Sequence, residues 1–284
     1  MWWPSQTPET QDMFKAIVAR KQLEFVGAGW SQCDEVSPSY RDIVDNTCTG
    51  HEYLRRTLGD ACPNGRCVRF GWQIDMFSGY SATTPSLWAN AGYDGMVIRF
   101  EGPDDMRNQW TDEQAFEFLW EDAVLGTNKS RILTHIIRWN YGDMLGTSKQ
   151  GLVRPTKSFA FSEWVLKTQA DVEAWAAALV SWSRARGSVF QAGHLAVWGS
   201  DFQFANASSW FRQMDMIVKE ITNNPKKYNA NIRYTTLSEY FDHLHSLELE
   251  FPVKRGVDFE FGWPHAWGRS PPTPSMPCVL MLTY

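Results

Sequence analysis

The sequence lacks the features of a membrane protein and of a nucleic-acid-binding protein. It has no apolar run of about eighteen residues, the minimum for a membrane-spanning helix, so no membrane span is expected. Its 27 lysine and arginine residues are scattered among 32 acidic residues, which gives a net charge of −5 and leaves no basic stripe for nucleic acid. The first residues also lack the basic and apolar regions of a signal peptide.

Cysteine and histidine are scarce, with 5 and 6 residues. The odd number of cysteines argues against a complete set of disulfides, although Cys62 and Cys67 bracket a turn sequence and can close a small loop in an oxidising compartment. No group of cysteines and histidines has zinc-finger spacing. His243 and His245 lie in an expected helix, where residues two apart face apart, so we expect them to be surface or partly buried residues and not metal ligands.

Aromatic residues are abundant, with 15 tryptophans and 17 phenylalanines in 284 residues. Together with a hydrophobic content of 43%, they are sufficient for the core of one large domain. Indole rings also suit a sugar site, because the apolar faces of pyranose rings stack on them. For any single tryptophan, burial in the core is the more common role.

The hydrophobic pattern alternates between the periods of helices and strands. Helices are expected over residues 9–22, 40–58, 85–91, 170–184, 207–222 and 238–247, the last capped by Ser238. Strands are expected over residues 23–26, 68–74, 93–98, 131–137, 190–198 and 229–235. This order predicts parallel strands joined by helices, in one α/β domain without internal repeats.

Two aspartates follow expected strands, and they are the candidate catalytic residues. Asp75 comes directly after the apolar run from Val68 to Ile74, and Asp201 follows the strand that ends at Trp198. Reactive side chains gather at the carboxyl ends of strands in α/β sheets. A single aspartate at such a place more often caps the next helix or bonds a loop amide, and for Asp201 a cap of the helix at 207–222 is the alternative.

The sequence around Asp75 resembles the Trp-x-Ile-Asp-Pro-Phe-Gly-His-Ser signature of the family 38 glycoside hydrolases, the retaining α-mannosidases of the lysosome and Golgi. The residues that match are Trp72, Ile74, Asp75, Phe77 and Ser81, and those that depart are Met76, Ser78 and Tyr80. Upstream, residues 22–26 and the Gly29-Trp30 pair resemble a strand and a Gly-Gly-Trp segment of the family. Downstream, the Gly-Ser-Asp-Phe segment around Asp201 also matches.

The resemblance implies roles for four residues. Asp75 would be both the nucleophile and a zinc ligand, and Asp201 would be the general acid and base, since retaining glycosidases use two carboxyl groups about 5–5.5 Å apart. Arg99 and Tyr141 lie near family positions that contact substrate, and a surface arginine after a strand is the alternative for Arg99. One Zn²⁺ ion is implied as the cofactor, but the other ligands of the family site, a His-x-Asp pair and a later histidine, have no match in this sequence.

The resemblance also implies a fold and a reaction. The expected fold is an irregular seven-stranded β/α barrel of the glycoside hydrolase and deacetylase type, incomplete here: residues 1–267 form part of the catalytic domain, and residues 268–284 are an unmatched proline-rich tail. The expected activity is zinc-dependent hydrolysis, with retention, of terminal α-mannosyl residues on N-glycan-type oligosaccharides. The partner is then a mannose-containing oligosaccharide or glycoprotein, met by the full-length protein in the lysosome, the vacuole or another secretory compartment.

Two alternatives remain open. A truncated, catalytically inactive homologue with at most weak sugar binding would account for the unmatched zinc ligands, and we expect the chain to be a fragment, cut at its start and frame-shifted or mis-spliced at its end. A polysaccharide deacetylase also uses an aspartate and zinc, but the sequence has no His-x-x-x-His pair. The sequence does not indicate an oligomeric state.

Overall fold

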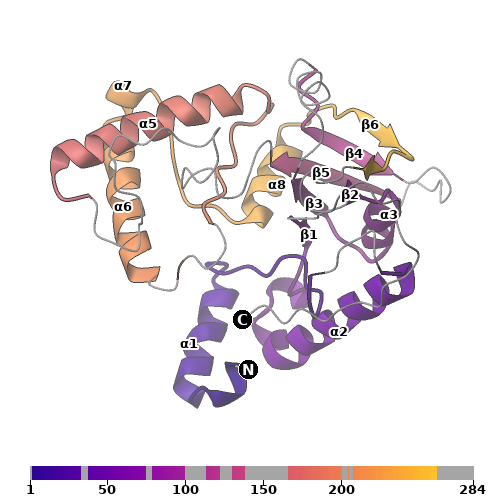
Figure 1. Cartoon of the computed structure of the whole chain (residues 1–284). Helices are drawn as coiled ribbons and strands as arrows, with labels where there is room; N and C mark the ends of the chain where they lie inside the picture. Colours follow the sequence, from indigo (N-terminus) through magenta and orange to yellow (C-terminus); the bar gives the residue numbers. More distant parts are fainter. Residues whose placement is uncertain are drawn as a thin grey trace, which may run out of the picture. The chain divides into compact units, whose positions relative to one another are not determined.

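A computed structural model of the chain describes residues 2–32, 38–74, 79–99, 113–121, 130–137, 166–199, 204 and 207–260. The chain divides into two compact units, and the second consists of residues 111–116 and 137–235. Helices and strands follow one another along the chain, which confirms the predicted α/β class (Figure 1). Among the described residues, no helix combines the length and the apolar character that crossing a membrane requires.

Among the described residues, five strands form the larger sheet of the first unit, in the order β1-β3-β5-β4-β6. They are β1 (Phe70–Gln73), β3 (Gly95–Arg99), β4 (Glu117–Glu121), β5 (Arg131–Ile137) and β6 (Val253–Arg255). β1 pairs in parallel with β3, and β4 in parallel with β6. Because β1 and β6 are the two ends of this order, the described sheet is not closed, and the seven-stranded barrel is not confirmed.

The pairing of β4 with β5 is antiparallel, which differs from the all-parallel sheet that the alternation predicts. The reason is the short connection between Glu121 and Arg131, since a parallel crossover needs about a dozen or more residues.

The strand expected at 23–26 is reduced, within the described residues, to one parallel bridge between Phe25 and Val68.

The described residues of the first unit form four α-helices: α1 (Pro8–Ala19), α2 (Tyr40–Leu58), α3 (Thr83–Asn90) and α8 (Leu237–Ser246). Helices α3 and α8 lie on opposite faces of the β1–β3 pair. A Cβ on Gly71 would meet the Trp88 ring of α3, whereas a Cβ on Gly95, the partner of Phe70, would meet Phe241 of α8. Since neighbouring residues of a strand point to opposite faces, the two contacts sandwich the sheet between the helices.

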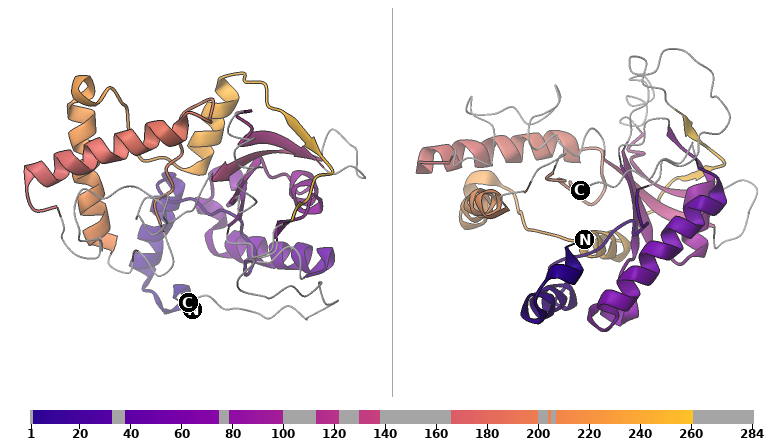
Figure 2. Two further views of the ribbon diagram at one scale, coloured as in Figure 1. Left: turned by 45° about the horizontal axis from the view of Figure 1, so that its top comes forward. Right: turned by 60° about the horizontal axis from the view of Figure 1, so that its bottom comes forward.

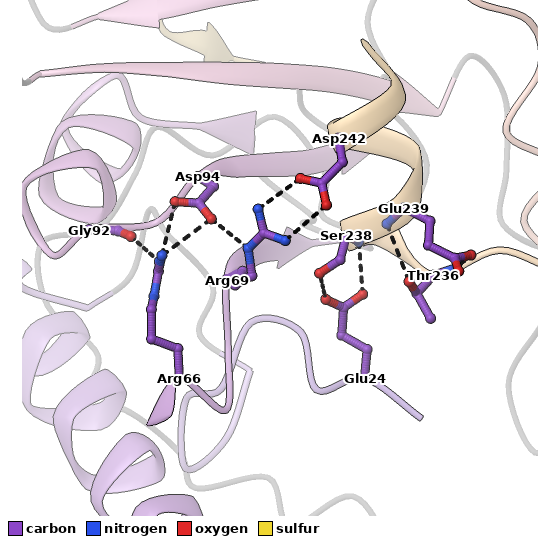
Figure 3. Close-up of polar contacts among 9 residues, drawn as sticks. All are labelled: Glu24, Arg66, Arg69, Gly92, Asp94, Thr236, Ser238, Glu239 and Asp242. Carbon is purple, nitrogen blue, oxygen red and sulfur yellow. Dashed lines mark hydrogen bonds and ion pairs between the residues drawn. The ribbon is translucent and has the colours of Figure 1, made fainter. Parts of the chain in front are cut away.

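Charged groups attach α8 to the start of β1 (Figure 3). Arg69 donates from Nε to Asp94 over 2.6 Å and from Nη2 to Asp242 over 2.9 Å. The Arg69 hydrogen bond is the main reason that the pKa of Asp242 is lowered, so this carboxylate stays ionised in mild acid. Partly exposed ion pairs of this kind contribute about 0–1 kcal/mol each to stability.

The N-terminus of α8 corrects one prediction. Its cap is Thr236, whose side chain accepts from the Glu239 amide in a reciprocal capping box, and not Ser238 as expected from the sequence (Figure 3). The Ser238 amide instead donates to Glu24 over 3.0 Å. The sequence predicts a strand at Glu24, but the Glu24 carboxylate forms a second attachment of the same helix.

The described part of the second unit is helical, with α5 (Gln169–Gly187), α6 (Ala207–Asn223) and the short α7 (Pro225–Tyr228). Helix α5 crosses α6 in Figure 1 and in the left view of Figure 2, and its Trp175 and Leu179 share a core with Trp210 and Ile217 of α6. The strands predicted at 190–198 and 229–235 are wrong as far as the structure describes them. An extended segment becomes a strand only by pairing, and no strand is described between residues 166 and 236 to pair with them.

Candidate active site

The candidate active site is built around the carboxyl ends of β1 and β3. The two strands run in parallel with Gln73 beside Ile98, so both end at the same edge of the sheet. Asp75 follows β1 by two residues but lies outside the described residues, which reach Ile74 and resume at Gly79. The buried strand predicted before Asp75 is confirmed as β1, whereas the position and the role of Asp75 stay predictions.

Arg99 is the last residue of β3 and is only 5% exposed. The alternative of a surface arginine after a strand is therefore wrong. A guanidinium is always charged, and burying a charge is costly unless other groups compensate for it. The sequence could place Arg99 at the end of a strand but could not show its burial, which depends on packing from distant parts of the chain.

Tyr80 connects the two strand ends. Its hydroxyl donates to the carbonyl oxygen of Gln73 over 2.9 Å and accepts from the amide of Arg99 over 3.0 Å. The Tyr80 side chain is 2% exposed, so this double hydrogen bond is shielded from water. The sequence showed Tyr80 only as a departure from the family signature, and no periodicity or spacing marks it as a bridge.

The residues on both sides of Asp75 are anchored. The side-chain amide of Gln32 donates to the carbonyl of Ile74. After the gap, β2 (Gly79–Tyr80) pairs antiparallel with β7 (Phe259–Glu260), and the amide of Ala82 donates to Asp258 over 2.6 Å. These contacts fix where the chain leaves β1 and where it returns.

A second buried polar group joins the sheet to α8. His135 of β5 and Tyr240 of α8 both bond the same carboxylate oxygen of Glu117 in β4, at 3.0 and 2.6 Å. Burial raises the pKa of Tyr240, and the charge and the hydrogen bond of Glu117 raise it further. No motif marks these residues in the sequence, although a glutamate and a histidine inside apolar strands are a signal for a buried pair.

Besides Asp75, two further predicted site residues lie outside the described residues, Tyr141 and Asp201. Helix α6 begins at Ala207, well after Asp201, so the alternative that Asp201 caps this helix does not fit the helix boundary. The strand expected before Asp201 is absent from the described residues 190–199. The prediction that Asp201 lies at the end of a strand is therefore not supported.

The described residues do not assemble a metal site. They contain no group of three or more His, Cys, Asp or Glu side chains that could hold an ion. His243 and His245 are exposed on the last turn of α8, as predicted, and His135 is hydrogen-bonded to Glu117 and Tyr240.

The disulfide expected between Cys62 and Cys67 is confirmed, with Cα atoms 4.7 Å apart.

Comparison with known proteins identifies the family. The N-terminal domain of glycosyl hydrolases family 38 matches residues 1–258 of the chain. The chain belongs to glycoside hydrolase family 38. This family 38 chain is 30% identical over 259 residues to a probable alpha-mannosidase of Arabidopsis thaliana, a match that covers 89% of the chain and 23% of the relative.

Two further relatives agree with this assignment. The chain is 30% identical over 270 residues to the lysosomal alpha-mannosidase of Cavia porcellus, covering 92% of the chain and 25% of the relative. It is 28% identical over 272 residues to an alpha-mannosidase of Canavalia ensiformis, covering 95% of the chain and 26% of the relative. The chain thus spans about a quarter of the length of these relatives.

Proposed function

We propose that this family 38 chain carries part of the catalytic centre of a zinc-dependent, retaining α-mannosidase that removes terminal α-mannosyl residues from N-glycan-type oligosaccharides. The observation that carries the proposal is the buried Arg99 at the end of β3, beside the strand that leads into Asp75. A buried charge at the carboxyl edge of a sheet is typical of a functional site. The names of the relatives supply the substrate class, α-mannosides.

In the proposed reaction, Asp75 attacks the anomeric carbon while Asp201 gives its proton to the glycosidic oxygen, so that the aglycone leaves as an alcohol. Asp201, now ionised, takes a proton from water, and the water oxygen displaces the Asp75 carboxylate from the sugar. Two inversions at one carbon give retention. Arg99 and Tyr141 would contact the sugar and hold it against Asp75.

Zinc belongs to the proposal as the metal of the family, with Asp75 as one ligand. The described residues do not complete a site for it, because none of their histidines or carboxylates forms a three-ligand group. The seven-stranded barrel and a lysosomal or other secretory location are likewise proposed for the full-length protein, the latter from the lysosomal relatives.

Two variants separate the proposed roles of the aspartates. Asp75→Asn should abolish hydrolysis of every α-mannoside, because the nucleophile is lost. Asp201→Asn should reduce hydrolysis of methyl α-mannoside by about 10²–10⁴-fold, since general acid catalysis contributes that much, and should affect 2,4-dinitrophenyl α-mannoside, whose leaving group needs no proton, far less in the glycosylation step. Steady-state and pre-steady-state rates measure both effects.

The control for this experiment is Asp60→Asn, which changes an exposed aspartate and should leave the rates unchanged. Turnover that survives in Asp75→Asn would refute the nucleophile assignment. Mannose binding without turnover by the wild-type chain, and without bound zinc, would favour the inactive homologue over the enzyme.

A further inference from the structure

We infer that Tyr80 is a positioning residue of the active site, which sets the distance between the ends of β1 and β3 and thereby the place of Arg99 relative to the chain that enters Asp75. The inference rests on the proposed function for its kinetic consequence. Its structural part rests on two hydrogen bonds, from the Tyr80 hydroxyl to Gln73 and from the Arg99 amide to that hydroxyl.

The bridge stands where the regular ladder between the strands ends. Gln73 is paired with Ile98, and beyond this pair the Gln73 carbonyl and the Arg99 amide both bond the phenol oxygen of Tyr80. Gln73, Tyr80 and Arg99 are 4%, 2% and 5% exposed, so bulk water cannot replace the hydroxyl. Because buried backbone groups are bonded to partners, we expect loss of this oxygen to shift the two strand ends relative to each other.

Tyr80 is itself held firmly. It pairs with Phe259 in the β2–β7 ladder. The Phe259 ring packs against Trp120 of β4 with ring centres 4.8 Å apart, and against Phe118 with ring centres 5.8 Å apart. The contacts of Phe259 with the sheet core therefore fix the Tyr80 phenol, and the phenol in turn holds the Arg99 amide in place.

The kinetic consequence follows from geometry. Arg99 is proposed to hold the sugar, and Asp75 follows Gln73 by two residues, so a shift between the strand ends changes the angle and distance of attack. A misplacement of about 1 Å can cost about 10²-fold in rate. We therefore expect the change to fall on kcat more than on KM.

The test compares Tyr80→Phe with Tyr93→Phe as a matched control. Tyr93 also lies in the first unit, and its buried hydroxyl also bridges two groups, donating to the Gly27 carbonyl over 2.8 Å and contacting His51 at 2.5 Å. On an aryl α-mannoside, Tyr80→Phe should lower kcat by about tenfold or more with KM within about twofold. Tyr93→Phe should keep kcat near the wild-type value, even where its melting temperature falls as much as that of Tyr80→Phe.

Equal kcat values in the two variants would overturn the inference and leave the proposed function intact. An inactive wild-type chain would contradict the proposed function, and the bridge is then decided by amide hydrogen exchange measured by NMR. Tyr80→Phe should speed exchange at Arg99 relative to Val97, at the centre of β3. Unchanged exchange at Arg99 would overturn the inference whatever the activity.

Discussion

At the scale of single residues, Gly71 is the point where β1 passes against the ring of Trp88. A Cβ at this position would overlap the ring of that tryptophan. Gly71→Ala should therefore destabilise the chain by about 1–3 kcal/mol, the usual cost of overpacking a core, measured by equilibrium unfolding in urea. The control is Gly59→Ala, where nothing lies within 4 Å of the added carbon. Equal free energies of unfolding for the two variants would show that the contact is not as tight as described.

Arg99 and Tyr80 show which features of the candidate site can be predicted from the sequence and which cannot. Arg99 was placed at a strand end from the apolar run before it, and the structure puts it there as the last residue of β3. The Tyr80 bridge is held by pairing of Tyr80 with Phe259, which is distant in sequence. Local patterns carry no information on such contacts, so the bridge was missed.

At the scale of elements, the capping box of α8 offers the clearest test. Thr236→Ala removes the oxygen that accepts from the Glu239 amide, and loss of such a cap typically costs about 1 kcal/mol. The effect should appear in global unfolding, because Phe241 of the same helix stacks on Phe70 of β1 with ring centres 4.7 Å apart. Ser246→Ala, at the exposed C-terminal end of α8, is the control and should cost less than about half as much. A larger loss from Ser246→Ala would contradict the assignment of the cap.

Helices were predicted well because their signals are local. Helix α2 begins and ends where the sequence placed it, at Tyr40 and Leu58, with Ser39 and Asp42 forming its capping box. Strand β5 also agrees, since its apolar run over 131–137 is long and is buried on both faces. The strands expected at 190–198 and 229–235 failed because pairing needs a partner that a local pattern cannot supply.

At the scale of the whole molecule, membership in family 38 was predicted from a few residues around Asp75 and Asp201, and the match over residues 1–258 confirms it. The closed barrel was not confirmed, because closure is a property of strand order and not of any motif. The roles of Asp75, Asp201 and Tyr141 stay predictions, since the structure describes none of the three. They define the chemistry that an experiment on the whole chain has to test.

The most direct measurement is the anomeric form of the sugar first released from an aryl α-mannoside, followed by proton NMR before mutarotation. The account predicts that mannose is released and that its α anomer appears first, because two displacements at Asp75 retain the configuration. The β anomer appearing first would contradict the covalent role of Asp75. Absence of released mannose at protein concentrations equal to those of the substrate would contradict catalysis by this chain altogether.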